Sequence, residues 1–137
     1  MGLFLAEMEE QLEMLNQSVL ALENSDRDPE ILNRLFRIAH TLKGSSATMG
    51  FDNISDLTHN MENLLDDVRK GKLAISSILI DTIFACLDQL QIWRDILASG
   101  SDNLEHANEL ISRLNDLASN SVHEEILAND VLELVIG

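Results

Sequence analysis

The residues best suited to chemistry gather around His40, on the water-facing side of a predicted helix. The apolar side of that helix is a stripe at helical spacing, formed by Ile31, Leu35, Ile38 and Leu42. On an ideal helical wheel His40 projects roughly 170° from the stripe, so we expect its ring to face solvent. Phe36 lies one turn before it and Lys43 one turn after, and Gly44 removes the side chain that would crowd the ring at i+4.

This arrangement suits phosphoryl transfer through a histidine. A neutral imidazole is a good nucleophile near pH 7, because its unperturbed pKa is about 6.5. A phosphoryl group on His40 would bring negative charge, which Lys43 can partly neutralise. The transition state is loose, so catalysis consists mainly of positioning and charge stabilisation. We expect donor and acceptor to dock on the surrounding surface, at Phe36, Arg37, Gly44 and Ala47.

A second group of candidate residues lies on the next predicted helix. His59 points away from the apolar stripe of that helix, and Glu62 lies three residues further on the flank of the same exposed side. If the two helices pack side by side, both residues can approach His40. Glu62 could then accept a hydrogen bond from one ring nitrogen of His40, which would fix the tautomer and leave the other nitrogen with its lone pair outward.

The elements that must position these residues are helices. Apolar residues recur at spacings of three and four in five segments, expected at about 3–24, 29–47, 53–70, 77–98 and 103–118. Expected helix starts are Asp28-Pro29, Asp52, Ser76 or Ser77, and a capping box of Asp102 with Glu105. Short loops make successive helices antiparallel neighbours. The sequence therefore predicts an all-α, up-and-down four-helix bundle over residues 1–118 with an additional C-terminal helix, and a tail or interdomain linker over 119–137.

Composition narrows the function classes. The chain has 137 residues, and its 24 Asp and Glu against 9 Lys and Arg give a net charge of −15, which disfavours binding of nucleic acid or anionic lipid. No apolar run approaches a membrane span and no signal peptide is visible, so we expect a cytoplasmic protein. Seven of the nine basic residues lie between positions 27 and 72 beside seven acidic ones, so this region is a neutral island where an anionic group meets least repulsion.

The motifs around both histidines resemble a known family. Residues 35–51, L-F-R-I-A-H-T-L-K-G-S-S-A-T-M-G-F, resemble the histidine phosphotransfer (HPt) motif, whose centre is H-x-x-K-G. Residues 57–66, L-T-H-N-M-E-N-L-L-D, and 69–73, R-K-G-K-L, resemble the version in the N-terminal domain of the chemotaxis histidine kinase CheA. The resemblance extends over about residues 3–118.

The resemblance implies a specific role for each candidate residue. His40 would be phosphorylated, on Nε2, by the ATP-binding catalytic domain of a kinase, and would pass the group to an aspartate of CheY-like or CheB-like response regulators. Lys43, His59 and Glu62 match the residues that surround the phosphorylated histidine in the family. ATP and Mg²⁺ would belong to the partner domains, with no cofactor or metal in this one.

Two alternatives follow from the same residues. Nothing here resembles an ATP-binding or dimerisation domain, so the chain is either an excised part of a CheA-type kinase or a stand-alone HPt protein of a multistep phosphorelay, and we expect a monomer. A non-catalytic helical adaptor would keep the bundle but gives no reason for His40, Lys43 and Gly44 to share one outward face. A di-metal carboxylate bundle would need paired Glu-x-x-His motifs, which the sequence lacks.

Overall fold

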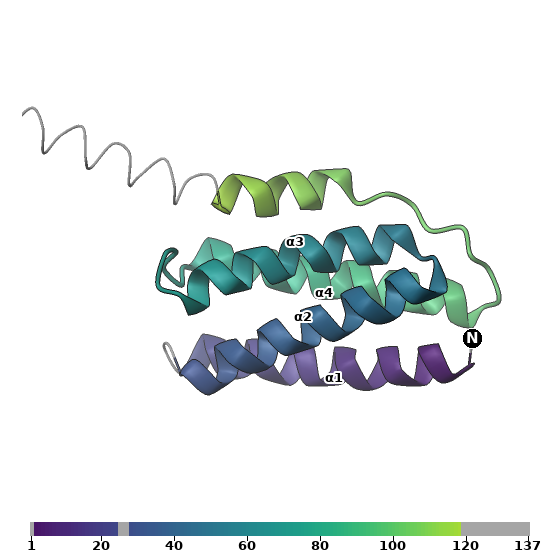
Figure 1. Ribbon diagram of the computed structural model, residues 1–137, viewed down its shortest axis with the longest axis horizontal. Helices are drawn as coiled ribbons and strands as arrows, with labels where there is room; N and C mark the ends of the chain where they lie inside the picture. Colours follow the sequence, from purple (N-terminus) through teal and green to yellow (C-terminus); the bar gives the residue numbers. More distant parts are fainter. Residues whose placement is uncertain (1, 25–27, 119–137) are drawn as a thin grey trace, which may run out of the picture.

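The protein is a bundle of α-helices. The computed structural model describes residues 2–24 and 28–118, and no strand occurs among them. The first four helices are α1 (Gly2–Asn24), α2 (Pro29–Met49), α3 (Asp52–Arg69) and α4 (Ser77–Ala98). Residues 108–118 form a fifth helix, which is the outermost one in Figure 1, above α3. The predicted all-α bundle with an additional C-terminal helix is therefore confirmed, whereas the predicted tail at 119–137 lies outside the described residues.

One apolar core runs through the bundle. The apolar stripes predicted on the second and third helices are buried throughout, because an amphipathic helix places its stripe against its neighbours. They are Ile31, Leu35, Ile38 and Leu42 on α2, and Ile54, Leu57, Met61, Leu64, Leu65 and Val68 on α3. Helical spacing predicts that the stripes of α1 and α4 begin at Leu5 and Ile80, but these two residues are only half-buried, and Phe4 and Leu79 are buried in their place. The helical period alone cannot distinguish these starts, because the next buried apolar residue, Met8 or Ile83, lies four positions from Phe4 or Leu79 and three from Leu5 or Ile80.

Local signals set most of the helix ends. The Asp28 carboxylate accepts a hydrogen bond from the Glu30 backbone N–H at 3.0 Å, and Pro29 follows at the first helical position. Ser76 caps α4 by accepting from the Leu79 backbone N–H at 3.1 Å. The helix α2 continues two residues beyond the expected end at Ala47 and stops at Gly50, whose φ of 79° is left-handed.

The predicted cap of α3 is wrong by one residue. Phe51 occupies the N-cap position without a side-chain hydrogen bond, and Asp52 is the first helical residue rather than the cap. The reason is tertiary: the Phe51 ring packs against the ring of Phe4 on α1, with 5.2 Å between centroids. The chain therefore turns within one residue after Gly50, and the Phe51 backbone N–H donates to the Ser46 carbonyl at 2.9 Å.

The predicted capping box before the fifth helix is also wrong. Residues 101–107 are not helical, and the helix begins at 108 instead of 103. Two side chains of the bundle hold this connection by its carbonyls: Asn53 donates to Leu104 at 2.7 Å, and the buried Trp93 indole donates to Glu105 at 3.1 Å. Because these carbonyls satisfy donors on α3 and α4, tertiary hydrogen bonds override the local start signal.

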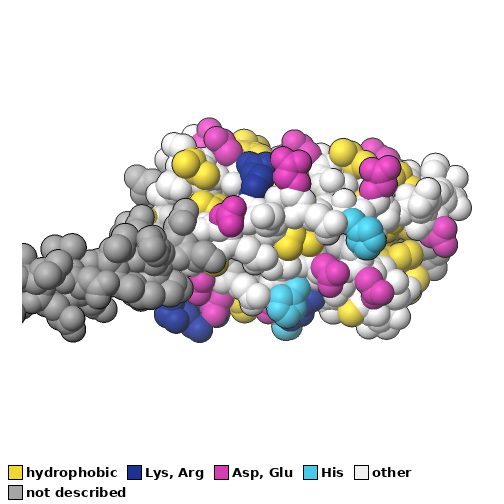
Figure 2. All heavy atoms as spheres, turned by 90° about the horizontal axis from the view of Figure 1, so that it is seen from above, with side chains coloured by type: hydrophobic (Ala, Val, Ile, Leu, Met, Phe, Trp, Pro, Cys, Tyr) yellow, Lys and Arg dark blue, Asp and Glu magenta, His cyan; other side chains and the backbone are white. Residues whose placement is uncertain are grey.

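The surface is mostly acidic. Figure 2 shows Asp and Glu side chains spread over the upper face of the molecule, with Lys and Arg at few places. The neutral island of residues 27–72 maps onto α2 and α3 and the loops beside them. Most of the described cations therefore lie on α2, at the end of α3 or in the turn that follows it.

Candidate functional site

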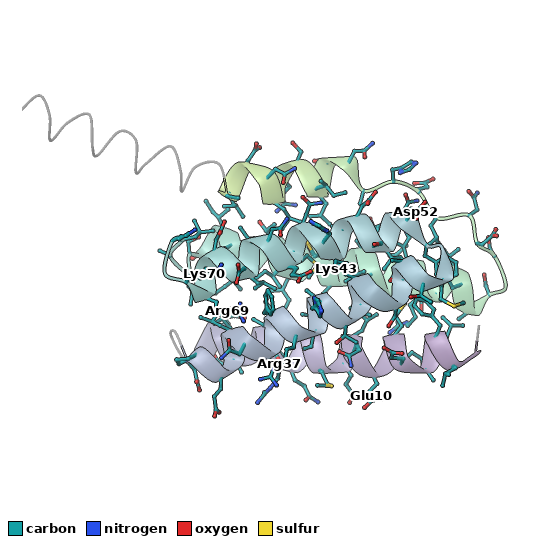
Figure 3. The ribbon with its side chains drawn as sticks, viewed as in Figure 1. Glu10, Arg37, Lys43, Asp52, Arg69 and Lys70 are labelled. Atoms are coloured by element: carbon teal, nitrogen blue, oxygen red, sulfur yellow. The ribbon has the colours of Figure 1, made fainter. Side chains whose placement is uncertain are left out.

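The site lies on the seam between α2 and α3, the two helices that pack most extensively against each other. His40 and Lys43 project from α2, and Glu62 projects from α3. Figure 3 shows Lys43 at the middle of this seam, where α2 crosses α3. The backbone of both helices is fixed by the core on their other side, so the three side chains stand on rigid elements.

Glu62 joins the other two residues. Its Oε1 lies 2.8 Å from Nδ1 of His40, and its Oε2 lies 2.6 Å from Nζ of Lys43. The side chain of Glu62 is only 12% exposed, whereas that of His40 is 62% exposed. The carboxylate is thus held within the seam, and the imidazole stands in solvent above it.

The electrostatics of Glu62 determine the state of the His40 ring. Burial raises the pKa of the Glu62 carboxyl, but the contacts with Lys43 and His40 outweigh that effect and leave the pKa below its usual range. The carboxyl is therefore ionised at neutral pH and can only accept hydrogen bonds. It follows that Nδ1 of neutral His40 carries the proton and donates it to Glu62, while Nε2 keeps its lone pair.

An aromatic ring and a guanidinium group complete the surroundings of His40. The Phe36 ring lies nearly parallel to the imidazole, at an interplanar angle of 9° and with 6.3 Å between centroids. Arg69, from the last turn of α3, places its Cζ 3.9 Å from the centroid of Phe36. Arg69 was not among the candidates predicted from sequence, because its contact depends on how α3 packs across α2.

Gly44 does not play the part expected from its spacing. A Cβ built at Gly44 would meet no atom within 4 Å, so an alanine here would not crowd the His40 ring. Gly44 instead lines, beside His40, a hollow of about 730 Å³ between the start of α1 and the end of α2. Leu3 and Met49 also line it and are 85% and 40% exposed. Neither residue was among the candidates predicted from sequence, although each is a large apolar residue outside the buried stripe of its helix.

The remaining predicted site residues form no side-chain hydrogen bond or ion pair with the cluster among the described residues. His59 is exposed, and none of the hydrogen bonds or ion pairs in the described part of the chain involves it. Ala47 is exposed near the end of α2. Arg37 lines a different hollow between α1 and α2, together with Arg34 and Thr41. The structure thus joins His40, Lys43 and Glu62 in one cluster and leaves His59, Arg37 and Ala47 outside it.

Comparisons with known proteins identify this arrangement. The family model of the Hpt domain matches residues 1–93, and the chain belongs to that family. It is homologous to the phosphotransfer domains of CheA. The chemotaxis protein CheA of Listeria monocytogenes is 38% identical over 117 residues, which cover 85% of this chain. Those residues are 19% of that CheA, so the chain spans about a fifth of the curated relatives it matches.

Solved structures agree with the fold. The CheA phosphotransferase domain from Thermotoga maritima is 41% identical with a TM-score of 0.68, over 71% of this chain and 92% of that one. The phosphorylated P1 domain of CheA3 from R. sphaeroides, solved in complex with CheY6, has a TM-score of 0.76 at 23% identity, over 89% of this chain and 94% of that one. Across the described residues, no helix is both long and apolar enough to span a bilayer.

Proposed function

We propose that His40 is the residue that carries the phosphoryl group, with Nε2 as the nucleophile. The observation that supports this most is the hydrogen bond from Nδ1 to Glu62, which leaves Nε2 as the nitrogen with the free lone pair. The ring is 62% exposed, so a large donor can reach it. A nucleophile on a rigid helix, oriented by a charged partner, has the geometry that nucleophilic catalysis requires.

The chemistry balances without a proton transfer at the ring. The Nε2 lone pair forms an N–P bond to the γ-phosphorus of ATP, and the bond between that phosphorus and the bridging oxygen breaks to release ADP. Nδ1 keeps its proton, so the phosphorylated ring is cationic, and Glu62 compensates this charge at 2.8 Å. An aspartate carboxylate of the acceptor then attacks phosphorus, and the N–P electron pair returns to Nε2.

Lys43 supplies positive charge near the phosphoryl oxygens. Lys43 lies three residues after His40 on α2, and its Nζ is held 2.6 Å from Oε2 of Glu62. A charge-assisted contact from this group would stabilise the loose transition state, where negative charge spreads over the phosphoryl oxygens. Glu62 thus acts as a positioning residue for both His40 and Lys43.

The partners follow from the chemistry and from the relatives. ATP and Mg²⁺ enter on the catalytic domain of a CheA-type kinase, and the acceptor is a receiver domain of the CheY or CheB kind, all in the cytoplasm, where this chain acts as a monomer. The hollow lined by Leu3, Gly44 and Met49 offers exposed apolar surface beside His40 for the acceptor. The relative solved in complex with CheY6 has the same fold, which supports this choice of partner.

The test is phosphate incorporation from labelled ATP in the presence of a CheA-type catalytic domain. His40→Gln should abolish the label, and the matched variant His106→Gln should keep it, because His106 is an exposed histidine outside the site. Absence of label in the unmodified chain, with several active kinase domains and with phosphoramidate as a small donor, would contradict the proposal and leave the helical adaptor.

A further inference from the structure

Three groups from two helices form a stack beside the reactive ring. Arg69 on α3 places its guanidinium carbon 3.9 Å from the centroid of the Phe36 ring on α2. The Phe36 ring lies parallel to the His40 imidazole within 9°, with centroids 6.3 Å apart. Figure 3 shows Arg69 near the C-terminal end of α3, pointing toward α2, whereas Lys43 lies nearer the middle of the seam.

We infer that Arg69 is a positioning residue for His40 and acts through Phe36. The inference rests on the proposed function of His40. A single hydrogen bond to Glu62 fixes the direction of Nδ1 but leaves the ring plane free to tilt about that bond. Because the imidazole is 62% exposed, few neighbours restrict the tilt. Phe36 supplies the second restraint, a parallel aromatic face at a separation where offset rings still attract each other.

The Phe36 ring can restrain His40 only if another residue holds the Phe36 ring itself in place. Its side chain is only half-buried, at the edge of the core. Arg69 covers the ring and attracts it by a cation–π interaction, for which the planar guanidinium group is well shaped. Asp66 holds Arg69 in place, because its Oδ1 lies 2.6 Å from a guanidinium nitrogen. The order of restraint is therefore Asp66, Arg69, Phe36 and then the His40 ring.

The α3 helix thus acts on His40 in two ways. Glu62 contacts the ring directly, and Arg69, seven residues later and two turns along the same side of the helix, acts through Phe36. The expectation from sequence was that Phe36 serves partner docking. The two roles differ in kinetics, because a docking residue changes KM for a protein partner, whereas a positioning residue changes the rate with any donor.

The chain offers a matched control for Arg69. Lys70 pairs with the other oxygen of the same carboxylate, Asp66 Oδ2, at 2.8 Å, whereas the cation–π contact with Phe36 in the described part of the chain is made by Arg69. Arg69→Gln and Lys70→Gln each remove one positive charge and one ion pair from Asp66. Only Arg69→Gln removes the group that covers the Phe36 ring.

The experiment measures phosphorylation of His40 by phosphoramidate, a donor too small to dock on Phe36. Arg69→Gln should lower this rate by about two- to five-fold, the factor expected for one exposed cation–π contact. In a second assay with the kinase domain, its KM should stay unchanged. Lys70→Gln should keep the wild-type rate. Equal losses in both variants, or a change confined to KM, would overturn the inference.

A double-mutant cycle and a spectroscopic readout test the route through Phe36. In a Phe36→Leu background, Arg69→Gln should cause no further loss, since its target is gone; an undiminished loss would overturn the inference. The His40 ring-proton resonances should shift in Arg69→Gln and not in Lys70→Gln. If the wild-type chain takes up no phosphoryl group, the proposed function fails; if it does and Arg69→Gln matches it in rate and spectrum, only this inference fails.

Discussion

The hydrogen bond from His40 to Glu62 leads to a quantitative prediction for the variant Glu62→Gln. A glutamine fits the same space but can either accept from Nδ1 or donate to it, so it no longer selects a tautomer. Hydrogen bonds to charged groups contribute about 1.5–3 kcal/mol. Because the His40 side chain is 62% exposed, the lower end applies. About 1.5 kcal/mol corresponds to about tenfold in the tautomer ratio.

The assay follows the ring and the reaction together. Nitrogen-15 NMR of the His40 ring should show the proton on Nδ1 in the wild-type chain and a mixture of tautomers in Glu62→Gln. Phosphorylation by a CheA-type catalytic domain should be about tenfold slower in this variant, because the ring becomes cationic as the N–P bond forms and loses its charge-assisted hydrogen bond to the carboxylate. Glu10→Gln is the control, because Glu10 is an exposed carboxylate of α1 away from the site.

Two results would refute this reasoning. One is a wild-type His40 ring whose proton lies mainly on Nε2 at neutral pH, since the Glu62 carboxylate would then have no donor on Nδ1. The other is a phosphorylation rate in Glu62→Gln within about twofold of that in Glu10→Gln, since the lost contact is assigned about tenfold.

Lys43→Gln should slow phosphorylation of His40 about tenfold, through loss of a charge-assisted contact, and should change the free energy of unfolding by less than about 1 kcal/mol in urea titrations. Gly44→Ala should stabilise the fold by about 1 kcal/mol, because the added Cβ meets nothing within 4 Å and alanine favours the helix over glycine. Because Gly44 lines the hollow proposed for the acceptor, the same variant should slow transfer to a receiver domain more than phosphorylation by phosphoramidate. An equal effect on both rates would contradict the role of the hollow. The pKa of Glu62 is lower in the folded chain than its unfolded value of 4.5, so the Glu62 charge stabilises the fold above pH 4.5. This contribution is lost as the pH falls through the folded pKa. The drop in Tm below about pH 4.5 should therefore be smaller in Glu62→Gln than in the wild-type chain. Burial raises the pKa of the Cys86 thiol to about 12, so it should react with a thiol reagent only after unfolding; labelling of the native chain at the rate of a free thiol would contradict the buried position.

Much of the fold follows from local pattern. The stripes on α2 and α3 are unbroken, and the caps at Asp28 and Ser76 use side chains that satisfy the first backbone N–H groups without help from other helices. The start of α3 and of the helix at 108–118 could not be predicted in this way. The first depends on Phe51 packing on Phe4, and the second on the carbonyl bonded by Trp93.

The features of the site also divide into those that follow from local sequence pattern and those that depend on helix packing. The outward face of His40 and the place of Lys43 one turn away depend only on helical period, so the sequence is sufficient for them. The contact between His40 and Glu62 needs the register of two helices, which the sequence left conditional and the structure supplies. The Arg69–Phe36 contact spans the same two helices, but no motif or spacing indicates it. For His59 the reverse holds: its spacing from Glu62 suggested a place in the cluster, but no hydrogen bond or ion pair joins it to His40 among the described residues.

The most direct test of the central claim is to identify the phosphorylated atom. The nitrogen-15-labelled chain would be phosphorylated by a CheA-type catalytic domain, and phosphorus–nitrogen coupling would be measured by NMR. We predict coupling to Nε2 of His40, with the Nδ1 proton retained against Glu62. Coupling to Nδ1, or a phosphoryl group on any other residue, would contradict the account.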